Sequence, residues 1–520
     1  MVVVSPYPAV TIPDIPLTSF VLERAQQLGS KPALIDGPSG RTITYGDLAG
    51  AVRAMGAGLT SKGFTKGDCF AIYMPNVPEY AVAFHGVAAI GGVTTTVNPL
   101  YTADELAFQL KDSNSKFLLT IPLFLDKATE AAGKSGVEEI FVLGDEAGAT
   151  PVTDLLSAGT EVPAVSIDVR NDLAVLPYSS GTTGFPKGVM LSHHNLVSNI
   201  CQFLGAQGIG EEDAVIGVLP FFHIYGMTVI MNGGLRGGAT IITMPRFDLE
   251  EYLDLSQKHK VTRAYLVPPV ILALAKHPIV DNYDLSSLQM IMSGAAPLGG
   301  DLAAAASDRL GCFVMQGYGL TETSPVTHVV PEDPSKNKPG SIGPPIPNTE
   351  CIVVDVTTGK EVATDEPGEV LIRGPQVMKG YLNNDTATRH TIDDDGWLHS
   401  GDIGRVDADG YFFLVDRLKE LIKYKGMQVA PAELEAVLLT HPQISDAAVI
   451  PIADEEAGEI PKAFVVLSEQ VSSDDIMAFV AERVAPHKKI RRVEVVDEIP
   501  KSASGKILRR VLKDREKAGT

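Results

Sequence analysis

Cysteine is scarce in this sequence, and no long hydrophobic run is present. The four cysteines form no C-x-x-C pair and none has a histidine at ligand spacing, which excludes a zinc site and a disulfide framework and is typical of a reducing cytosol. No apolar run approaches the length of a membrane span. The N-terminus lacks the basic segment and apolar core of a signal peptide, and the C-terminal Lys-Ala-Gly-Thr is not a peroxisomal address. We therefore expect a cytoplasmic protein without stable membrane insertion.

Positive charge is also in short supply. The chain has 43 lysines and arginines against 64 acidic residues, a net charge of −21. A field of this sign repels nucleic acid and anionic membranes, so neither is an expected partner. If the ligand is itself a polyanion, it must be held by local cations, backbone amides or a metal ion.

The length and the pattern of the 520 residues predict two domains of the α/β class. Helix-like and strand-like segments alternate from about residue 17 to 330, as in the helix expected at Tyr45–Leu59 and the strand at Cys69–Tyr73, which favours mostly parallel sheets flanked by helices. Between about 340 and 415, short strands separated by Gly, Pro and Asp turns predict a small β-rich subdomain.

The alternation resumes after Asp416, which predicts a second, α+β domain. Pro431 is well placed as the first residue of a helix, and a basic helix is expected at Ile507–Lys517. We therefore predict a large domain of residues 1–416 and a small one of residues 417–520.

The most informative segment is Tyr-Ser-Ser-Gly-Thr-Thr-Gly-Phe-Pro-Lys-Gly at residues 178–188. Its glycines let backbone amides turn toward one point, and its hydroxyls and lysine add donors and charge, as a triphosphate site requires. The candidate phosphate-binding residues are Ser179, Ser180, Gly181, Thr182, Thr183, Gly184 and Lys187. It is not a Walker A loop, because Gly188 follows the lysine and the chain enters a second strand before Ser192 caps a helix.

This loop resembles the signature of adenylate-forming enzymes: acyl-CoA synthetases, luciferases and peptide-synthetase adenylation domains. The similarity covers essentially the whole chain and is nearest to 4-coumarate–CoA ligases of the bacterial cinnamate/coumarate type. Residues 368–374 lack the cysteine of the plant signature. The resemblance implies a large N-terminal adenylation domain with a β-barrel-like subdomain and a small, mobile C-terminal lid that turns near Lys419.

The resemblance also implies a nucleotide site and its metal ion. Tyr318 can stack on a purine, Thr321 can bond a phosphate, and Glu322 can ligate Mg²⁺, which takes oxygen ligands. Asp402 can accept both hydroxyls of a ribose. The implied nucleotide-binding residues after the loop are Ala295, Gln316, Gly317, Tyr318, Thr321, Asp402 and Arg417.

Four further residues are implied as catalytic. His223 would lie beside the reacting carboxylate, and Lys506 would bridge that carboxylate and the α-phosphate as a compact cation. Lys423 and Gln428 would act after the lid has turned, when CoA attacks the acyl-adenylate. ATP, Mg²⁺ and CoA are thus the expected cofactors and co-substrates.

The acid itself is predicted from the pocket residues. The residues implied to line the pocket are Tyr225, Gly294, Gly319, Pro325 and Val326. Two glycines, a ring and apolar walls suit a flat 4-coumarate or another hydroxycinnamate. Four alternatives remain open: a medium- or long-chain fatty-acyl-CoA ligase, an enzyme that loads a carrier protein, a luciferase-like oxygenase, and a non-catalytic nucleotide sensor. We expect a monomer or a homodimer.

Overall fold

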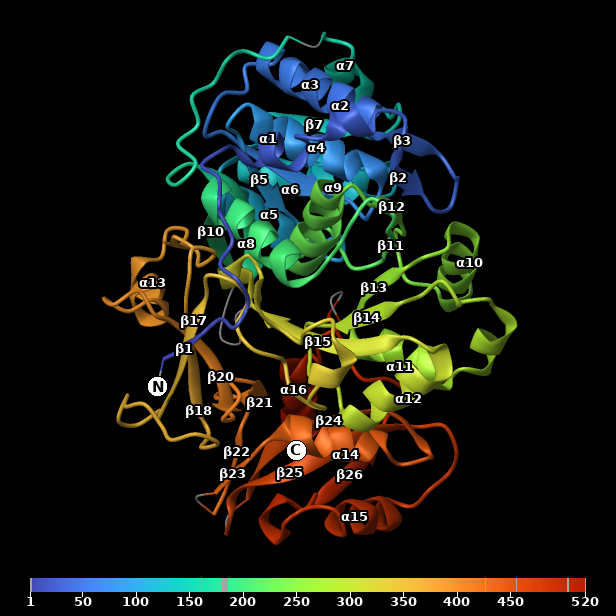
Figure 1. The fold of residues 1–520 in the computed structure, drawn as a ribbon, viewed down its shortest axis with the longest axis vertical. Coiled ribbons are helices and arrows are strands. Elements are labelled where there is room, and N and C mark those ends of the chain that lie inside the picture. The colour runs from blue at the N-terminus through green and yellow to red at the C-terminus, as the bar shows by residue number, and fades with distance from the viewer. Residues whose placement is uncertain are drawn as a thin grey trace.

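Two mostly parallel eight-stranded sheets form the large part of the molecule (Figure 1). The structure is a computed structural model that describes residues 2–159, 161–179, 186–425, 427–454, 456–502 and 505–519. In spatial order the first sheet contains β19 (Gly380–Tyr381), β10 (Lys187–Ser192), β9 (Leu173–Ser179), β5 (Val93–Thr96), β4 (Cys69–Tyr73), β6 (Ser115–Thr120), β7 (Glu139–Val142) and β8 (Thr150–Pro151). The second contains β16 (Val326–Val329), β15 (Phe313–Gly319), β14 (Met290–Ser293), β13 (Arg263–Leu266), β11 (Ala214–Gly217), β12 (Thr240–Thr243), β2 (Pro32–Asp36) and β3 (Thr42–Thr44).

Helices pack around these sheets, as the alternating pattern predicts. They are α1 (Leu17–Val21), α2 (Ala25–Leu28), α3 (Tyr45–Ser61), α4 (Pro78–Ala89), α5 (Ala103–Asp112), α6 (Leu125–Ser135), α7 (Val152–Leu156), α8 (His193–Ala206), α9 (Gly234–Gly237), α10 (Leu249–His259), α11 (Pro268–Lys276) and α12 (Gly300–Leu310). Ser192 caps α8 as predicted: its Oγ accepts the backbone N–H of Asn195 at 3.2 Å, and Asn195 Oδ1 accepts that of Ser192 at 2.9 Å.

A five-stranded antiparallel sheet forms the β-rich subdomain, at the left of Figure 1. Its strands in order are β1 (Val3–Val4), β17 (Glu350–Val354), β18 (Gly368–Arg373), β20 (Leu398–Val406) and β21 (Phe412–Arg417), with α13 (Asp385–Thr391) beside it. The edge strand β1 comes from the extreme N-terminus. The N-terminal segment therefore ties the subdomain to the rest of the large part.

The C-terminal part, orange and red at the bottom of Figure 1, has its own sheet. Its elements are β22 (Ile422–Tyr424), β23 (Met427–Val429), α14 (Pro431–Leu439), β24 (Ile444–Asp454), β25 (Gly458–Leu467), α15 (Ser473–Ala481), β26 (Arg492–Val495) and α16 (Arg509–Gly519). Pro431 opens α14 as predicted, whereas α16 starts two residues later than expected. The observed architecture confirms the predicted α/β class with a large N-terminal part and a small α+β C-terminal part.

The two parts are joined by residues 418–421. Asp402 and Arg417 are register partners in the β20–β21 ladder, so residue 417 still belongs to the subdomain sheet. Across the joint, Asp416 Oδ2 accepts the backbone N–H of Ala432 at 2.8 Å, in the first turn of α14. We propose that the domain boundary lies at this joint, one residue beyond the predicted position.

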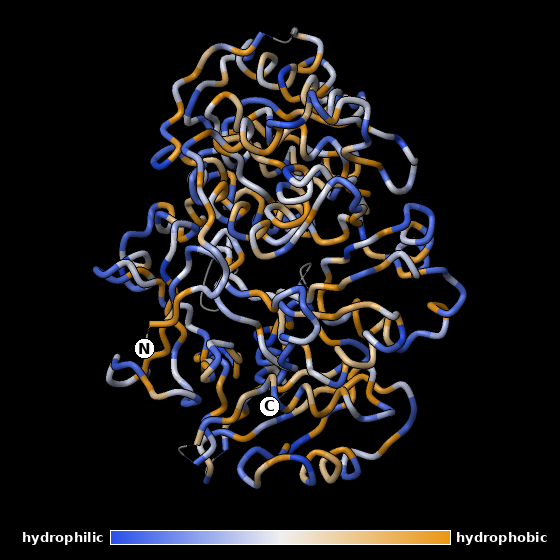
Figure 2. The backbone as a smooth tube through the Cα atoms, viewed as in Figure 1, coloured by the Kyte–Doolittle hydropathy of each residue, from blue (hydrophilic) through white to orange (hydrophobic). Residues whose placement is uncertain are grey.

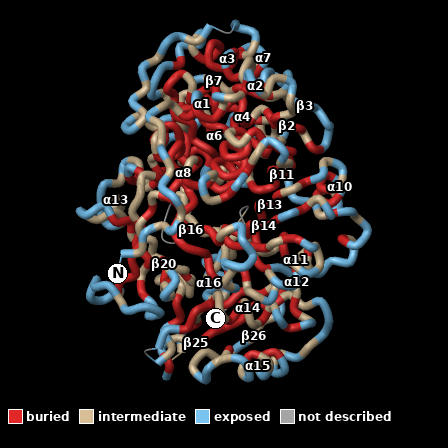
Figure 3. Tube along the Cα trace, in the orientation of Figure 1, coloured by how far each residue is buried: buried red, intermediate tan, exposed pale blue. Residues whose placement is uncertain are grey.

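Separate hydrophobic cores support this division. Buried residues concentrate in the strands and in the helix faces that cover them (Figure 3), and the hydrophobic stretches of the chain follow the same strands (Figure 2). The largest core spans both eight-stranded sheets, the subdomain has a small core around Val370 and Phe412, and the C-terminal part has two cores of its own. Across the described residues, none of the helices combines the length and apolar character that crossing a bilayer demands.

One buried ion pair holds the C-terminal part together. The Arg509 guanidinium on α16 binds both oxygens of Glu435 on α14, at 2.7 and 2.8 Å. Glu435 Oε1 also accepts the backbone N–H of Val449, and its residue is only 8% exposed.

We predict that Arg509→Leu lowers the stability of the C-terminal part by about 3 kcal/mol, because it leaves a buried carboxylate without its cation. The measurement is hydrogen exchange of the α14 and β24 amides. Arg510→Leu is the matched control, since its side chain is 77% exposed and only near Asp514. Equal protection in the two variants would contradict the prediction.

Candidate active site

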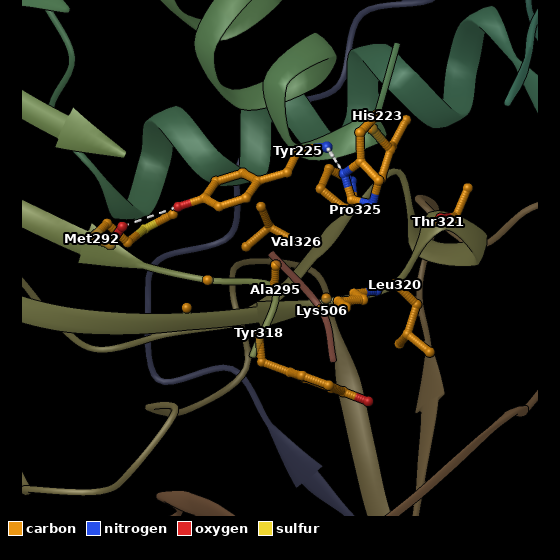
Figure 4. Close-up of a pocket in the computed structure, with 14 residues that line it drawn as sticks. His223, Tyr225, Met292, Ala295, Tyr318, Leu320, Thr321, Pro325, Val326 and Lys506 are labelled. Carbon is orange, nitrogen blue, oxygen red and sulfur yellow. Dashed lines mark hydrogen bonds between the residues drawn. The ribbon is translucent and has the colours of Figure 1, made fainter. Parts of the chain in front are cut away.

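A pocket opens where the carboxyl ends of β14 and β15 face the start of η2, a π-helix at Tyr225–Gly233 (Figure 4). The ends of parallel strands gather side chains from distant parts of the chain, and ligands commonly bind there. The predicted site residues that line this pocket are His223, Tyr225, Gly294, Ala295, Gly317, Tyr318, Gly319, Thr321, Pro325, Val326 and Lys506. The structure thus brings residues from five separate segments of the sequence to one cavity.

At one end of the pocket a phenol, a carboxylate and a guanidinium form a chain. The Tyr318 hydroxyl donates to Asp402 Oδ2 at 2.6 Å, and Arg417 Nε lies 3.4 Å from Asp402 Oδ1. Burial raises the pKa of Asp402, while Arg417 and the Tyr318 hydrogen bond oppose that rise. Asp402 is 6% exposed, and its carboxylate has further lone pairs that can accept paired hydroxyls such as those of a ribose.

The glycine-rich segment at residues 178–188 connects two antiparallel strands, β9 and β10. Ser179 and Lys187 are register partners at the ends of β9 and β10, and β10 leads to α8 only after six residues. This is the strand–loop–strand arrangement predicted from the sequence. Five predicted phosphate-binding residues of the loop lie outside the described residues: Ser180, Gly181, Thr182, Thr183 and Gly184.

Tyr381 lies between Lys187 and Glu322 at the mouth of this hairpin and contacts both side chains. The Lys187 ammonium lies 3.9 Å from the centroid of the Tyr381 ring, and the Tyr381 hydroxyl donates to Glu322 Oε1 at 2.7 Å. Burial lowers the pKa of Lys187, and the nearby Glu322 carboxylate opposes that shift. The result is one cation and one anion held by the same side chain, as a site for a metal–triphosphate complex requires.

These residues would fit a magnesium ion that is held mainly by a phosphate ligand. Within the described residues, no group of three acidic, histidine or cysteine side chains could hold a metal on its own. A single carboxylate such as Glu322 suits Mg²⁺, which usually takes one or two carboxylates and completes its shell with water and phosphate oxygens.

His223 enters the pocket as a neutral imidazole. The backbone N–H of Tyr225 donates to His223 Nδ1 at 3.3 Å, which places the proton of the neutral ring on Nε2. Burial, and to a lesser degree the Lys506 ammonium, lowers the pKa of His223 to about 3. Its Nε2 can therefore donate a hydrogen bond to an anion without carrying charge.

Lys506 reaches the pocket from the C-terminal part. Its backbone N–H donates to Ser502 Oγ at 3.1 Å. The preceding residue, Gly505, has a φ of +78°, and a Cβ at this position would lie 3.0 Å from the Val267 side chain. Burial and, to a lesser degree, the Arg417 guanidinium lower the pKa of Lys506 to about 8, while the carboxylates of Asp402 and Glu322 oppose that shift. The bond to Ser502 and the close packing of Gly505 against Val267 thus hold Lys506 at the site.

Lys423 and Gln428 lie elsewhere. They are register partners on the β22–β23 hairpin, and both are exposed. The structure therefore places Lys506 in the pocket while the other predicted catalytic pair faces solvent.

At the end of the pocket near Tyr225, the wall is closely packed. The Tyr225 hydroxyl donates to the backbone carbonyl of Met292 at 3.1 Å, so the ring, with its hydroxyl already bonded, faces the cavity. A Cβ on Gly294 would lie 2.6 Å from that ring. A Cβ on Gly319 would lie 2.1 Å from the Pro325 carbonyl oxygen, so Gly319 is required by close backbone packing as well as by pocket space.

Other residues differ from the sequence reasoning. Gln316 does not line the pocket: its amide accepts the Leu298 N–H at 2.8 Å and donates to the Ser341 carbonyl at 3.4 Å. The wall residues that the sequence reasoning missed are Ile224, Met292 and Leu320. Two of them, Ile224 and Leu320, are sequence neighbours of predicted pocket residues and could have been predicted on that basis. No sequence motif pointed to Tyr381.

Two protein-family models match the chain. The AMP-binding enzyme model matches residues 21–382, and the model of the AMP-binding enzyme C-terminal domain matches residues 433–506. Among curated proteins, 4-coumarate–CoA ligase 5 of Oryza sativa subsp. japonica is 45% identical, over 98% of this chain and 97% of its own. 4-coumarate:CoA ligase 1 of Petunia hybrida is 44% identical, over 99% and 97%.

Solved structures share the fold over nearly the whole chain. The anthranilate CoA ligase AuaEII in complex with anthranoyl-AMP has a TM-score of 0.90 at 27% identity and covers 99% of both chains. ATP-bound MatB from Rhodopseudomonas palustris has a TM-score of 0.87 at 29% identity, covering 97% of this chain and 99% of its own. Because the first family model spans more than half of the sequence and the relatives match it from end to end, the chain belongs to the AMP-binding enzymes of the adenylate-forming superfamily and is similar over its length to 4-coumarate–CoA ligases.

Proposed function

We propose that this protein is an ATP-dependent acid–CoA ligase that activates 4-coumarate or another hydroxycinnamate. The observation that carries the proposal is the position of Lys506, which lies in one pocket with His223 and Tyr318. A cation there adjoins both the nucleotide end and the acid end of the cavity. Relatives named 4-coumarate–CoA ligases match the chain at up to 45% identity and support this substrate class.

The first step joins two anions. A carboxylate oxygen of the acid attacks the α-phosphorus of ATP, the bond from that phosphorus to the bridging oxygen breaks, and pyrophosphate leaves. Lys506 offsets the repulsion between carboxylate and α-phosphate, and His223 Nε2–H holds a carboxylate oxygen. Asp402 and Tyr318 hold the nucleoside while Lys187 binds the outer phosphates.

Glu322 is the side chain that would hold Mg²⁺, which supplies charge neutralisation for the phosphate oxygens when bound. Thr321 opens the same short helix as Glu322, η4 (Thr321–Thr323), and is placed to donate its hydroxyl to a phosphate oxygen.

In the second step the CoA sulfur, having lost its proton, attacks the acyl carbon. A thioester bond forms, the bond to the AMP oxygen breaks, and AMP leaves. We propose that the small domain turns about residues 418–421 between the steps, so that Lys506 leaves and the Lys423–Gln428 hairpin replaces it. This order accounts for the exposure of that hairpin when Lys506 is in the pocket.

The acid pocket suits a flat ring. The Tyr225 ring, Gly294 and the Pro325–Val326 segment form a narrow slot with few free polar groups, because the Tyr225 hydroxyl is already bonded. The cytoplasmic location and the monomeric or homodimeric state stay predictions.

We predict CoA-dependent turnover with 4-coumarate when pyrophosphate release is measured with ATP and Mg²⁺ over cinnamate, 4-coumarate, caffeate, octanoate and palmitate. A preference for octanoate or palmitate would support the ligase reaction but show that the acid is a fatty acid. Pyrophosphate release that is stimulated by a carrier protein and not by CoA would show that the acyl acceptor is a carrier protein. No release with any acid would contradict the proposal.

We predict that Lys506→Ala slows adenylation by about 100-fold, because one electrostatic contact to the transferring group is lost. Thioester formation from a supplied acyl-adenylate should stay within about twofold. Lys423→Ala should show the reverse pattern. Arg510→Ala, an exposed cation near Lys506 in the sequence, is the control for both half-reactions. Equal loss of both half-reactions in each variant would contradict the assignment.

We predict that kcat/KM for adenylation falls as the pH rises through about 8. The pKa of Lys506 is lowered to about 8, so its ammonium is fully present below that pH and is lost above it. Because the pKa of His223 is about 3, titration of this residue causes no second change in the pH–rate profile near neutrality. Residual activity of Lys506→Arg should lack this alkaline limb, because a guanidinium stays charged. A flat wild-type profile up to pH 9.5 would contradict the role of Lys506.

A further inference from the structure

Tyr381 lies between the two charged residues assigned to the triphosphate. It is 4% exposed and sits in β19, the edge strand next to β10. Its ring face meets the Lys187 ammonium, 3.9 Å from the centroid, and its hydroxyl donates to Glu322 Oε1 at 2.7 Å. One side chain therefore binds a cation and an anion through different parts of its structure.

The backbone around Tyr381 fixes this position. The Met378 N–H donates to the Glu322 carbonyl at 2.9 Å, the Lys379 N–H to the Met190 carbonyl at 3.0 Å, and the Leu382 N–H to the Gly188 carbonyl at 2.8 Å. Residues 378–382 are thus bonded both to the strand that carries Lys187 and to the short helix that carries Glu322. We call these five residues the 378–382 clip.

The arrangement prevents an unproductive ion pair. Lys187 and Glu322, both described residues, have opposite charges and influence each other electrostatically, yet no ion pair within 4 Å joins them. An ammonium is attracted to the face of an aromatic ring, and a phenol donates a strong hydrogen bond to a carboxylate. Tyr381 gives each charge a partner that is not the other.

We propose that Tyr381 is a positioning residue that keeps Lys187 and Glu322 apart and aimed at one metal–triphosphate group. The inference rests on the proposed function, because it takes the ligand to be a magnesium–nucleoside triphosphate. It assigns the 378–382 clip, rather than the glycine-rich loop alone, to the recognition of the β- and γ-phosphates.

A purely structural Tyr381 would behave differently. If the ring only filled the core, its loss would weaken every nucleotide contact alike. If it positions Lys187 and Glu322, its loss weakens triphosphate binding and spares AMP, because AMP lacks the β- and γ-phosphates and is held by Tyr318 and Asp402.

The test is isothermal titration calorimetry of the full-length protein with Mg²⁺ and α,β-methylene-ATP, and separately with AMP. We expect Tyr381→Phe to raise the Kd of the triphosphate analogue about fivefold, through the lost charge-assisted hydrogen bond. Tyr381→Leu should raise it further, by about another threefold, through the lost ring contact. The Kd of AMP should change less than twofold in both variants.

Tyr45→Phe is the matched control, since Tyr45 is also a buried phenol with one hydrogen bond, 2.7 Å to the Ala239 carbonyl, and does not line the pocket. It should leave both Kd values unchanged. In a Glu322→Ala background, Tyr381→Phe should raise the Kd of the triphosphate analogue less than twofold, because the partner of the hydroxyl is gone.

The outcomes separate the two proposals. Equal weakening of AMP binding and of triphosphate-analogue binding would overturn the positioning role, and so would an undiminished effect of Tyr381→Phe in the Glu322→Ala background. In either case, acid-dependent pyrophosphate release by the wild-type protein would still support the ligase. A wild-type protein that binds neither nucleotide would overturn the proposed function and this inference with it.

Discussion

The entry of Lys506 into the pocket is the contact on which the rest of the site depends. The cavity walls come from the large domain, but the cation that adjoins both of its ends comes from the small one. In a protein with a net charge of −21, two anionic ligands can meet only where positive charge is held locally. The fold concentrates that charge by placing Lys506 of the C-terminal part in a cavity of the large part.

Burial sets the charge state of each group in this closed site. The pKa of His223 falls to about 3, so the imidazole is a neutral donor, whereas the pKa of Lys506 falls only to about 8, so the ammonium persists near neutrality. Desolvation lowers both values, and the carboxylates of Asp402 and Glu322 account for part of the difference because they stabilise the ammonium. In this site, His223 therefore acts as a neutral hydrogen-bond donor, whereas Lys506 carries the positive charge.

Much of this arrangement could be predicted from the sequence. The strand Cys69–Tyr73, the Ser192 cap and the start of α14 follow from local pattern, because burial, capping and the fixed φ of proline act over a few residues. The pocket residues followed from the similarity of short segments to a known family.

What could not be predicted depends on contacts between distant residues. The two-residue strand β1 exists only because Val3 pairs with Cys351, and the amide of Gln316 is occupied by backbone groups brought close by the fold. The position of Tyr381 depends on the pairing of β19 with β10, and no local sequence pattern predicts this pairing.

The hydrogen bond from Ala432 to Asp416 has a consequence for how long the closed arrangement lasts. An acceptor at a helix start contributes about 1 kcal/mol, and Ala430 before α14 has no side chain to supply one. Any turn about residues 418–421 that carries α14 away from β21 must break this bond. In the domain turn proposed above, the bond to Asp416 would therefore prolong the arrangement with Lys506 in the pocket several-fold, until stronger contacts form elsewhere.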